Sequence, residues 1–255
     1  TVSVLGEHVA KSEEASQAVQ QFIAVLDEAT RFMLNTNISV KLTSFGLRVD
    51  PELCHRLVED LVVQAAARSN FVRIDMEDSS CTTDTLNLYR RLREKHDNVG
   101  VVLQAYLRRS MDDIEDLLPL KPNVRVCKGI YVEPAELAFQ DHDEINDSFA
   151  RMIDRLLSSG CYVGIATHDE TLVRAGFDTV SRLKVERSAY EFQMLLGVTE
   201  DLRQSILDAG HRLRVYVPFG AQWYAYSVRR LKENPRIAGH VFRNLIGRLS
   251  GNGRG

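Results

Sequence analysis

The 255-residue sequence lacks a long hydrophobic run. No apolar stretch approaches the roughly 18–20 residues that cross a bilayer as a helix, so we expect no transmembrane segment. No signal peptide is visible, and Thr1 already stands in an expected strand, which leaves room for an upstream segment that has been cut away. The formal net charge of −3 gives no whole-protein field that would attract nucleic acid, so we expect no nucleic-acid partner.

Paired cysteines and glycine-rich phosphate loops are absent as well. The four cysteines are far apart and form no CxxC pair, which argues against a disulfide framework and against a structural zinc site. Cys127 and Cys161 lie in or beside expected strands, where reduced packing residues are typical. This cysteine usage indicates a protein of a reducing, cytoplasmic compartment. No GxGxxG or GxxxxGK[ST] motif occurs, so a Rossmann site and a P-loop lose their main sequence support.

What the sequence does contain is a regular alternation of short β-branched runs and amphipathic stretches. The expected strands are Val2–Leu5, Ile38–Leu42, Phe71–Ile74, Val99–Leu103, Val124–Cys127, Tyr162–Ala166, Ala189–Phe192 and Leu213–Val217. Helices are expected over Glu13–Leu34, Pro51–Arg68, Thr83–Lys95, Asp143–Leu157, Glu170–Leu183 and Glu200–Ala209, and a shorter one before the fifth strand.

Strict alternation of strand and helix predicts a parallel sheet. Eight such units in about 250 residues is the size of one closed (βα)8 TIM barrel. A doubly wound sheet is the alternative, but it usually offers a glycine-rich first turn that is missing here. We therefore expect an α/β protein with a single barrel domain over residues 1–249 and a flexible tail at residues 250–255.

Polar or ionisable residues stand at the end of nearly every expected strand. Catalytic groups of a barrel project from the carboxyl ends of its strands, so a full ring of such residues predicts an active site there. The ring consists of Glu7, Lys41, Asp75, Gln104, Arg125, Lys128, Thr167, His168, Gln193 and Tyr216.

Each member of this ring also has a structural interpretation. Lys41 is either a Schiff-base lysine, a substrate anchor or a salt-bridge partner. The acidic run Asp75, Glu77 and Asp78 could bind a metal, although such a run is usually a solvated turn. His168 begins a His-Asp-Glu tripeptide that recurs at His142, so a metal role for it is weakly supported. We expect no metal site.

The stretch Tyr216–Glu233 combines the last expected strand with a helix that ends before Asn234–Pro235. On that helix one face carries Gln222, Tyr226, Arg229, Arg230 and Glu233. Two adjacent guanidinium groups beside a tyrosine can receive a small carboxylate, because each guanidinium can bind both carboxylate oxygens.

Seven blocks of sequence, in order and one per βα unit, carry a family resemblance. They read VKLTSFG (40–46), RIDMEDS (73–79), VVLQAYLRR (101–109), VRVCKGIYVEP (124–134), ATHDE (166–170), EFQMLLGV (191–198) and YAYSVRRLKENP (224–235). Together they resemble the proline dehydrogenase family, and more closely its single-domain bacterial form.

The resemblance implies a distorted (βα)8 barrel whose last helix lies over the carboxyl-terminal mouth. It also implies an FAD enzyme that oxidises L-proline to Δ1-pyrroline-5-carboxylate by hydride transfer from C5 to the flavin N5. Electrons would pass to a membrane quinone, so the protein would be cytoplasmic with peripheral contact at the inner membrane face. Asp75 and a water are the two candidates to take the proton of the proline amine.

The resemblance also implies roles for individual residues. Arg229 and Arg230 would clamp the proline carboxylate with help from Lys41, while Asp75 and Glu7 would pair with those arginines. Tyr216 and Tyr226 would wall the substrate ring. The flavin would be held by Val102, Gln104, Arg125, Lys128, Gly129, Ile130, Tyr131, Ala166, Thr167, His168, Gln193, Leu195 and Glu233, with Tyr131 also near the substrate.

Two other functions remain possible at this stage. One is a Schiff-base or metal-dependent lyase on the same barrel, using Lys41, Lys128, or Asp75 with His168. The other is a binding or regulatory subunit without turnover. A flavoenzyme would be yellow and would be bleached by proline, whereas the lyase would be colourless.

We expect the substitution Arg229→Met to raise the KM for proline severely while leaving the flavin spectrum intact. Loss of one charge-assisted bidentate contact should cost on the order of 2–4 kcal/mol of transition-state binding. Steady-state kinetics with L-proline measure this cost, and unchanged kinetics would refute the clamp.

Overall fold

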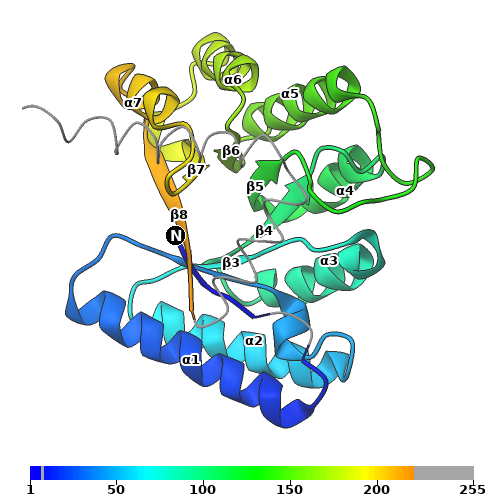
Figure 1. The fold of residues 1–255 in the computed structure, drawn as a ribbon, viewed down its shortest axis with the longest axis vertical. Coiled ribbons are helices and arrows are strands. Elements are labelled where there is room, and N and C mark those ends of the chain that lie inside the picture. Colours follow the sequence, from blue (N-terminus) through cyan, green and yellow to red (C-terminus); the bar gives the residue numbers. More distant parts are fainter. Residues whose placement is uncertain (7–8, 221–255) are drawn as a thin grey trace, which may run out of the picture.

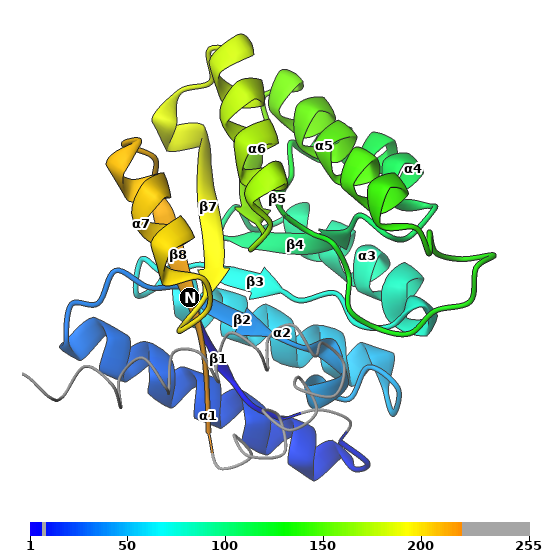
Figure 2. The ribbon, with the colours of Figure 1, turned by 45° about the horizontal axis from the view of Figure 1, so that its top comes forward.

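The computed structural model describes residues 1–6 and 9–220, and in it eight parallel strands close into a barrel in sequence order (Figures 1 and 2). The strands are β1 (Val2–Val4), β2 (Ile38–Val40), β3 (Val72–Ile74), β4 (Val99–Gln104), β5 (Asn123–Cys127), β6 (Tyr162–Ala166), β7 (Tyr190–Leu195) and β8 (Leu213–Phe219). The barrel closes because β8 pairs with β1, placing Val217 opposite Val2. The expected (βα)8 architecture is confirmed.

Helices surround this barrel on the outside, as Figures 1 and 2 show. They are α1 (Ser12–Arg31), α2 (Pro51–Ala66), α3 (Ser79–Arg93), α4 (Ser110–Leu117), α5 (His142–Ser158), α6 (Glu170–Arg182) and α7 (Glu200–Asp208). Three short 3-10 turns accompany them: η1 (Leu42–Phe45), η2 (Leu118–Leu120) and η3 (Arg187–Ala189). Within the described part of the chain, no helix combines the length and the apolar character needed to cross a bilayer.

Aspartate residues cap the N-termini of several helices. The Asp50 carboxylate accepts a hydrogen bond from Leu53 N at 2.9 Å, and Pro51 occupies the first turn, where its missing N–H costs nothing. Asp78, Asp141 and Asp169 cap α3, α5 and α6 in the same way. After β3 and β6, where the connection is short, the cap fixes the strand end against the helix that follows it.

Several element boundaries differ by a few residues from the sequence-based expectation, and two of these differences have a clear physical cause. The third helix starts at Ser79, four residues before the expected Thr83, because the Asp78 side chain accepts from Ser80 N and begins the helix there. The last strand continues past Pro218 to Phe219, since its carbonyl accepts from Leu5 N at 2.8 Å and so extends the pairing with β1. Proline lacks an amide donor but does not prevent its neighbour from accepting.

The apolar core lies between the strands and the helices, whereas the inside of the barrel is polar. Barrel interiors are usually filled by branched aliphatic residues. Here Arg73 lies inside the barrel, 2% exposed, and donates to the Asn123 carbonyl at 2.6 Å and the Val101 carbonyl at 3.1 Å. Gly100 makes room for it, because a Cβ there would overlap the guanidinium. Burial lowers the pKa of Arg73 to about 10.

An apolar groove of about 440 Å³ runs along the outside of β8 and α1. Its lining includes Val2, Val25, Leu34 and Phe219. A helix following β8 in a regular barrel would pack here, against β8, β1 and α1. No described helix covers this groove. The expected last helix, over the mouth of the barrel, falls outside the described residues.

Candidate active site at the carboxyl ends of the strands

Asp75, directly after β3, is the centre of a buried polar cluster. Its Oδ1 accepts hydrogen bonds from Ser39 Oγ and from the Arg125 guanidinium. Its Oδ2 lies 3.4 Å from Lys41 Nζ and accepts from the Tyr216 hydroxyl at 3.1 Å. Lys41, Asp75 and Arg125 are each at most 8% exposed. Side chains from β2, β3, β5 and β8 therefore meet at one carboxylate.

Burial and charge act on the pKa of Asp75 in opposite directions. Desolvation acts to raise it, but the positive charges of Arg125 and Lys41 and the hydrogen bonds from Ser39 and Tyr216 hold the pKa below its ordinary value. Burial and the nearby Asp75 charge raise the pKa of the Tyr216 phenol. A carboxylate with a lowered pKa is ionised at neutral pH and accepts protons poorly, so Asp75 is better suited to anchor charges than to act as a general base.

This geometry shows which partners Lys41 and Arg125 have among the described residues. Lys41 forms an ion pair with Asp75, which is the salt-bridge role considered from the sequence. It lies at the rim, where it can also face a substrate. Arg125 pairs with Asp75 and places its Cζ 5.2 Å from the centroid of the Tyr216 ring. The predicted pairs of Asp75 and Glu7 with Arg229 and Arg230 involve residues outside the described part.

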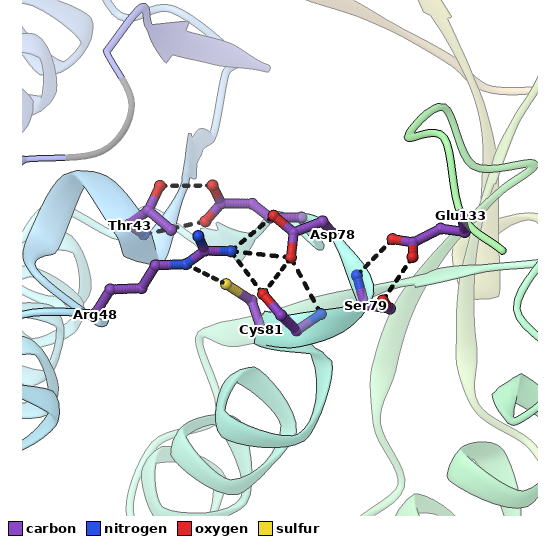
Figure 3. A network of polar contacts seen from close by, with 8 residues as sticks. Thr43, Arg48, Asp78, Ser79, Cys81 and Glu133 are labelled. Carbon is purple, nitrogen blue, oxygen red and sulfur yellow. Dashed lines mark hydrogen bonds and ion pairs between the residues drawn. The ribbon is translucent and has the colours of Figure 1, made fainter. Parts of the chain in front are cut away.

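The acidic run after β3 contacts the neighbouring loops and is not a solvated turn. Glu77 is 2% exposed and accepts from Thr43 N at 3.0 Å and Thr43 Oγ1 at 2.6 Å. Asp78 pairs with Arg48 at 2.7 Å (Figure 3). Over residues 1–6 and 9–220, no group of three or more His, Cys, Asp or Glu side chains is arranged to hold a metal ion. The run instead ties the loops after β2 and β3 together.

Gln104 and Gln193 present amides at the ends of β4 and β7. The Gln104 side chain is 2% exposed, and its Oε1 has no hydrogen-bond partner among the described residues, while its Nε2 lies 3.5 Å from the Met76 carbonyl. Gln193 Nε2 donates to Glu191 Oε1 at 2.7 Å, and Gly164 leaves it room because a Cβ there would lie 2.6 Å from Nε2. A buried acceptor without a donor is costly, which points to a ligand at Gln104.

Lys128, after β5, takes part in a second ion pair at the rim. Its Nζ lies 2.7 Å from Asp169 Oδ2 and 3.2 Å from His142 Nε2. Asp169 also caps α6 by accepting from Thr171 N at 2.9 Å. Burial acts to raise the pKa of Asp169, but Lys128 and the cap hydrogen bond hold it below its ordinary value.

The remaining predicted cofactor residues line the same side of the rim. Thr167 and His168 follow β6, and His168 Nε2 accepts from Leu195 N at 2.8 Å, joining the ends of β6 and β7. Val102 lies in β4, two residues before Gln104, and Ala166 ends β6 and pairs with Gln193 of β7. A cavity of about 580 Å³ opens beside His168, lined further by Glu170, Thr199, Glu200, Asp201, Leu202 and Ser205.

Gly129, Ile130 and Tyr131 form the start of the loop after β5. Gly129 has a φ of +106°, and a Cβ at this position would lie 2.1 Å from the Tyr106 ring, so only glycine fits. Ile130 and Tyr131 are both partly exposed at the rim. Glu7, Tyr226, Arg229, Arg230 and Glu233 lie outside the described residues, so their predicted roles stay predictions.

Sequence reasoning missed Ser39 and Glu191, which support the site from one step below the rim. Ser39 stands two residues before Lys41, and Glu191 two residues before Gln193, so each shares a strand face with a predicted residue. Glu191 is 3% exposed and accepts from Arg214 Nε at 2.7 Å. Burial acts to raise the pKa of Glu191, but the hydrogen bond from Arg214 holds it below the usual value. Side chains on a strand alternate between its two faces, and this period of two residues was the signal that could have identified both residues.

Substituting Asp75→Asn should destabilise the protein, because Arg125 and Lys41 would remain buried without their carboxylate. The expected loss is on the order of 3 kcal/mol, or a fall in Tm of roughly 6–12 °C. The folded-state pKa of Asp75 is lowered, so its contribution is present above the ordinary aspartate pKa of about 3.9 and is lost as the pH falls through the lower folded value.

Differential scanning calorimetry at pH 7 and at pH 3 measures both effects. The Tm difference between wild type and Asp75→Asn should shrink at pH 3. The exposed Asp60, on α2, supplies the control Asp60→Asn, which should change Tm little. Equal stability of Asp75→Asn and wild type at pH 7 would contradict a stabilising role for the buried pair.

Comparison with known proteins agrees with this arrangement. A family model described as proline dehydrogenase matches residues 1–243. Proline dehydrogenase 1 of Bacillus subtilis is 35% identical over 246 residues, covering 96% of this chain and 82% of the relative. Proline dehydrogenase of Deinococcus radiodurans is 33% identical over 254 residues, covering 96% and 81%.

Among solved structures, proline utilization A from Bdellovibrio bacteriovorus superposes with a TM-score of 0.84 at 24% sequence identity. The match covers 91% of this chain but only 29% of that much longer one, so it supports the fold alone. The resemblance seen in the seven sequence blocks is thereby confirmed over nearly the whole length. The chain belongs to the proline dehydrogenase family.

Proposed function

We propose that this chain oxidises L-proline to Δ1-pyrroline-5-carboxylate, with FAD as its bound cofactor and a membrane quinone as electron acceptor. The observation that carries the proposal is the buried cluster of Lys41, Asp75, Arg125 and Tyr216, built at the mouth of a barrel of the proline dehydrogenase family. A small zwitterion needs fixed cations for its carboxylate and a polar, water-poor site for its amine, and this mouth offers cations held in place by an ionised carboxylate.

The substrate half of the site would be made by residues from both ends of the chain. Arg229 and Arg230 would clamp the carboxylate together with Lys41, while Tyr216, Tyr226 and Tyr131 would enclose the ring. Asp75 keeps Lys41 and Arg125 charged and immobile. Fixed charges of this kind stabilise a bound carboxylate without having to reorganise when it arrives. Glu7 would add a further ion pair at the same mouth.

The residues of the rim fit FAD. The Gln104 Oε1 lacks a partner among the described residues and can accept from a flavin N–H, and Gln193 offers a second amide at the end of β7. Lys128 and Arg125 can hold anionic parts of the cofactor, with Thr167, His168 and Leu195 on the β6–β7 side and Gly129, Val102 and Ala166 leaving space. When bound, FAD supplies N5 as acceptor of the hydride from C5 of proline and passes the electrons on to the quinone.

The proline amine must lose its proton for the imine product to form. Asp75 already accepts hydrogen bonds from three side chains and its pKa is lowered, so it is a poor acceptor for an ammonium proton. We therefore assign proton removal to a water at the mouth. Transfer of electrons to a membrane quinone further implies peripheral contact with the membrane.

The Schiff-base alternative receives no support from the described residues. A Schiff-base lysine must be neutral to attack a carbonyl. Lys41 lies 3.4 Å from Asp75, and Lys128 lies 2.7 Å from Asp169. Each lysine nitrogen is therefore engaged with a carboxylate and is not presented to a carbonyl as a free amine.

An anaerobic reduction experiment tests the proposed function. The protein loaded with FAD should be yellow, and L-proline should bleach its visible absorption in the absence of oxygen. Glycine at the same concentration should leave the spectrum unchanged, since it lacks the ring C5. A folded, flavin-loaded sample that proline cannot bleach would refute the proposal.

The substitution Gln104→Ala should weaken FAD binding by roughly 5–10-fold, which corresponds to the loss of one ordinary hydrogen bond. Titrating apoprotein with FAD and following the quenching of flavin fluorescence gives the Kd. Gln21→Ala, on the exposed face of α1, is the matched control and should bind FAD like the wild type. Unchanged FAD affinity and midpoint potential in Gln104→Ala would remove this residue from the cofactor site.

A further inference from the structure

The connection between β5 and α5 is a long loop that projects from the rim (Figure 2). Its two ends are held by the segment after β4. Tyr106 N donates to the Lys128 carbonyl at 2.8 Å at the start of the loop. Near its end Phe139 N donates to the Tyr106 carbonyl at 2.8 Å and Arg108 N to the Leu137 carbonyl at 3.0 Å. The apex, residues 130–134, carries the predicted substrate and cofactor contacts.

Glu133, in this apex, reaches a different element of the fold. Its Oε1 accepts from Ser79 N at 2.7 Å and its Oε2 accepts from Ser79 Oγ at 2.6 Å (Figure 3). Ser79 is the first residue of α3. The N–H groups in the first turn of a helix have no partner within the helix. A carboxylate is favoured there both by the donors and by the helix dipole. Because both carboxylate oxygens take part, the contact fixes the direction of the Glu133 side chain as well as its distance from Ser79.

The α3 end of this contact is itself held firmly. Directly before Ser79, Asp78 caps the helix and pairs with Arg48 at 2.7 Å. One residue earlier, Glu77 accepts from Thr43 N and Oγ1 in the loop after β2. Figure 3 shows these contacts as a continuous row from Thr43 to Glu133. The loops after β2, β3 and β5 are thereby joined into one unit.

We propose that Glu133 is a positioning residue for the substrate, which holds Tyr131 across the mouth of the barrel by fastening the loop apex to α3. The inference rests on the proposed function, because it gives Tyr131 its meaning as a wall of the proline site. Glu133 stands two residues after Tyr131, so releasing its carboxylate loosens the backbone on that side of the tyrosine, where the Glu133 carbonyl still accepts from Gln140 Nε2 at 3.2 Å. Lys41, one residue before η1, belongs to the same joined unit on the opposite side.

The test compares the KM for L-proline with kcat in the full-length holoenzyme. Glu133→Ala should raise the KM roughly 10-fold while kcat falls less than about threefold, because a displaced wall weakens binding more than chemistry. Glu133→Gln keeps an acceptor for Ser79 N and should recover much of the loss. Glu136→Ala, an exposed carboxylate of the same loop, is the matched control and should behave like the wild type.

A double-mutant cycle separates positioning from general destabilisation. Ser79→Ala removes one prong, so its effect on KM should be smaller than that of Glu133→Ala, and the double variant should be no worse than Glu133→Ala. Amide hydrogen exchange of residues 130–134 should be faster in Glu133→Ala. A lower Tm with unchanged KM, or full additivity of the two substitutions, would overturn the proposal.

Failure of this inference can be distinguished from failure of the proposed function. If proline reduces the wild type and Glu133→Ala equally well at low substrate, the positioning role is wrong and the function stands. If proline does not reduce the wild type, the function is wrong. The positioning role for proline then fails with it, and hydrogen exchange shows separately whether Glu133 fastens the loop: faster exchange confined to the apex in Glu133→Ala supports the fastening, and unchanged exchange overturns it.

Discussion

A carboxylate buried inside the barrel must be compensated by positive charge, and this requirement organises the mouth of the protein. Asp75 meets it with Arg125 and Lys41, and hydrogen bonds from Ser39 and Tyr216 complete its shell. The partners come from β2, β5 and β8, so the cluster forms only when the barrel has closed in the correct register. The charge arrangement that would receive a zwitterion is thus a product of the fold's closure.

The polar interior continues below this cluster and explains why the site is rigid. Arg73 donates hydrogen bonds to backbone carbonyls, and Glu191 accepts hydrogen bonds from Arg214 and Gln193. Side chains held in this way cannot relax toward water, so the groups above them keep their directions. Arg73, with no carboxylate beside it in the described contacts, leaves excess positive charge beneath the rim. Such an interior favours anionic ligands at the mouth.

Much of this fold was predictable from the sequence, because alternation of strands and helices is a local property. The rim residues were predictable for the same reason: each of Lys41, Asp75 and Gln104 ends an apolar run. Their partners were not predictable. Asp75 and Arg125 are fifty residues apart, and their pairing depends on how far β3, β4 and β5 are staggered. The family resemblance named the residues, but only the register assigns Asp75 its partners.

The contact between Glu133 and Ser79 was missed for a related reason. Nothing in the local pattern around Glu133 distinguishes it from Glu136, three residues later, which is exposed. The acidic run at Glu77 and Asp78 gave the opposite error. Its composition is typical of a solvated turn, whereas its side chains contact Thr43 and Arg48. Long-range side-chain contacts of this kind leave no periodic signature in the sequence.

Asp169 illustrates a consequence for engineering this barrel toward other cyclic amines. The same carboxylate starts α6 and holds Lys128 at the rim. A library that randomises the rim at this position would therefore select for helix initiation and for the placement of Lys128 at once, and few side chains satisfy both. Positions such as Ile130, which carry no cap, offer freer variation. Rim positions therefore differ in how many substitutions they tolerate. The fewest are tolerated where one side chain both caps a helix and holds a rim residue.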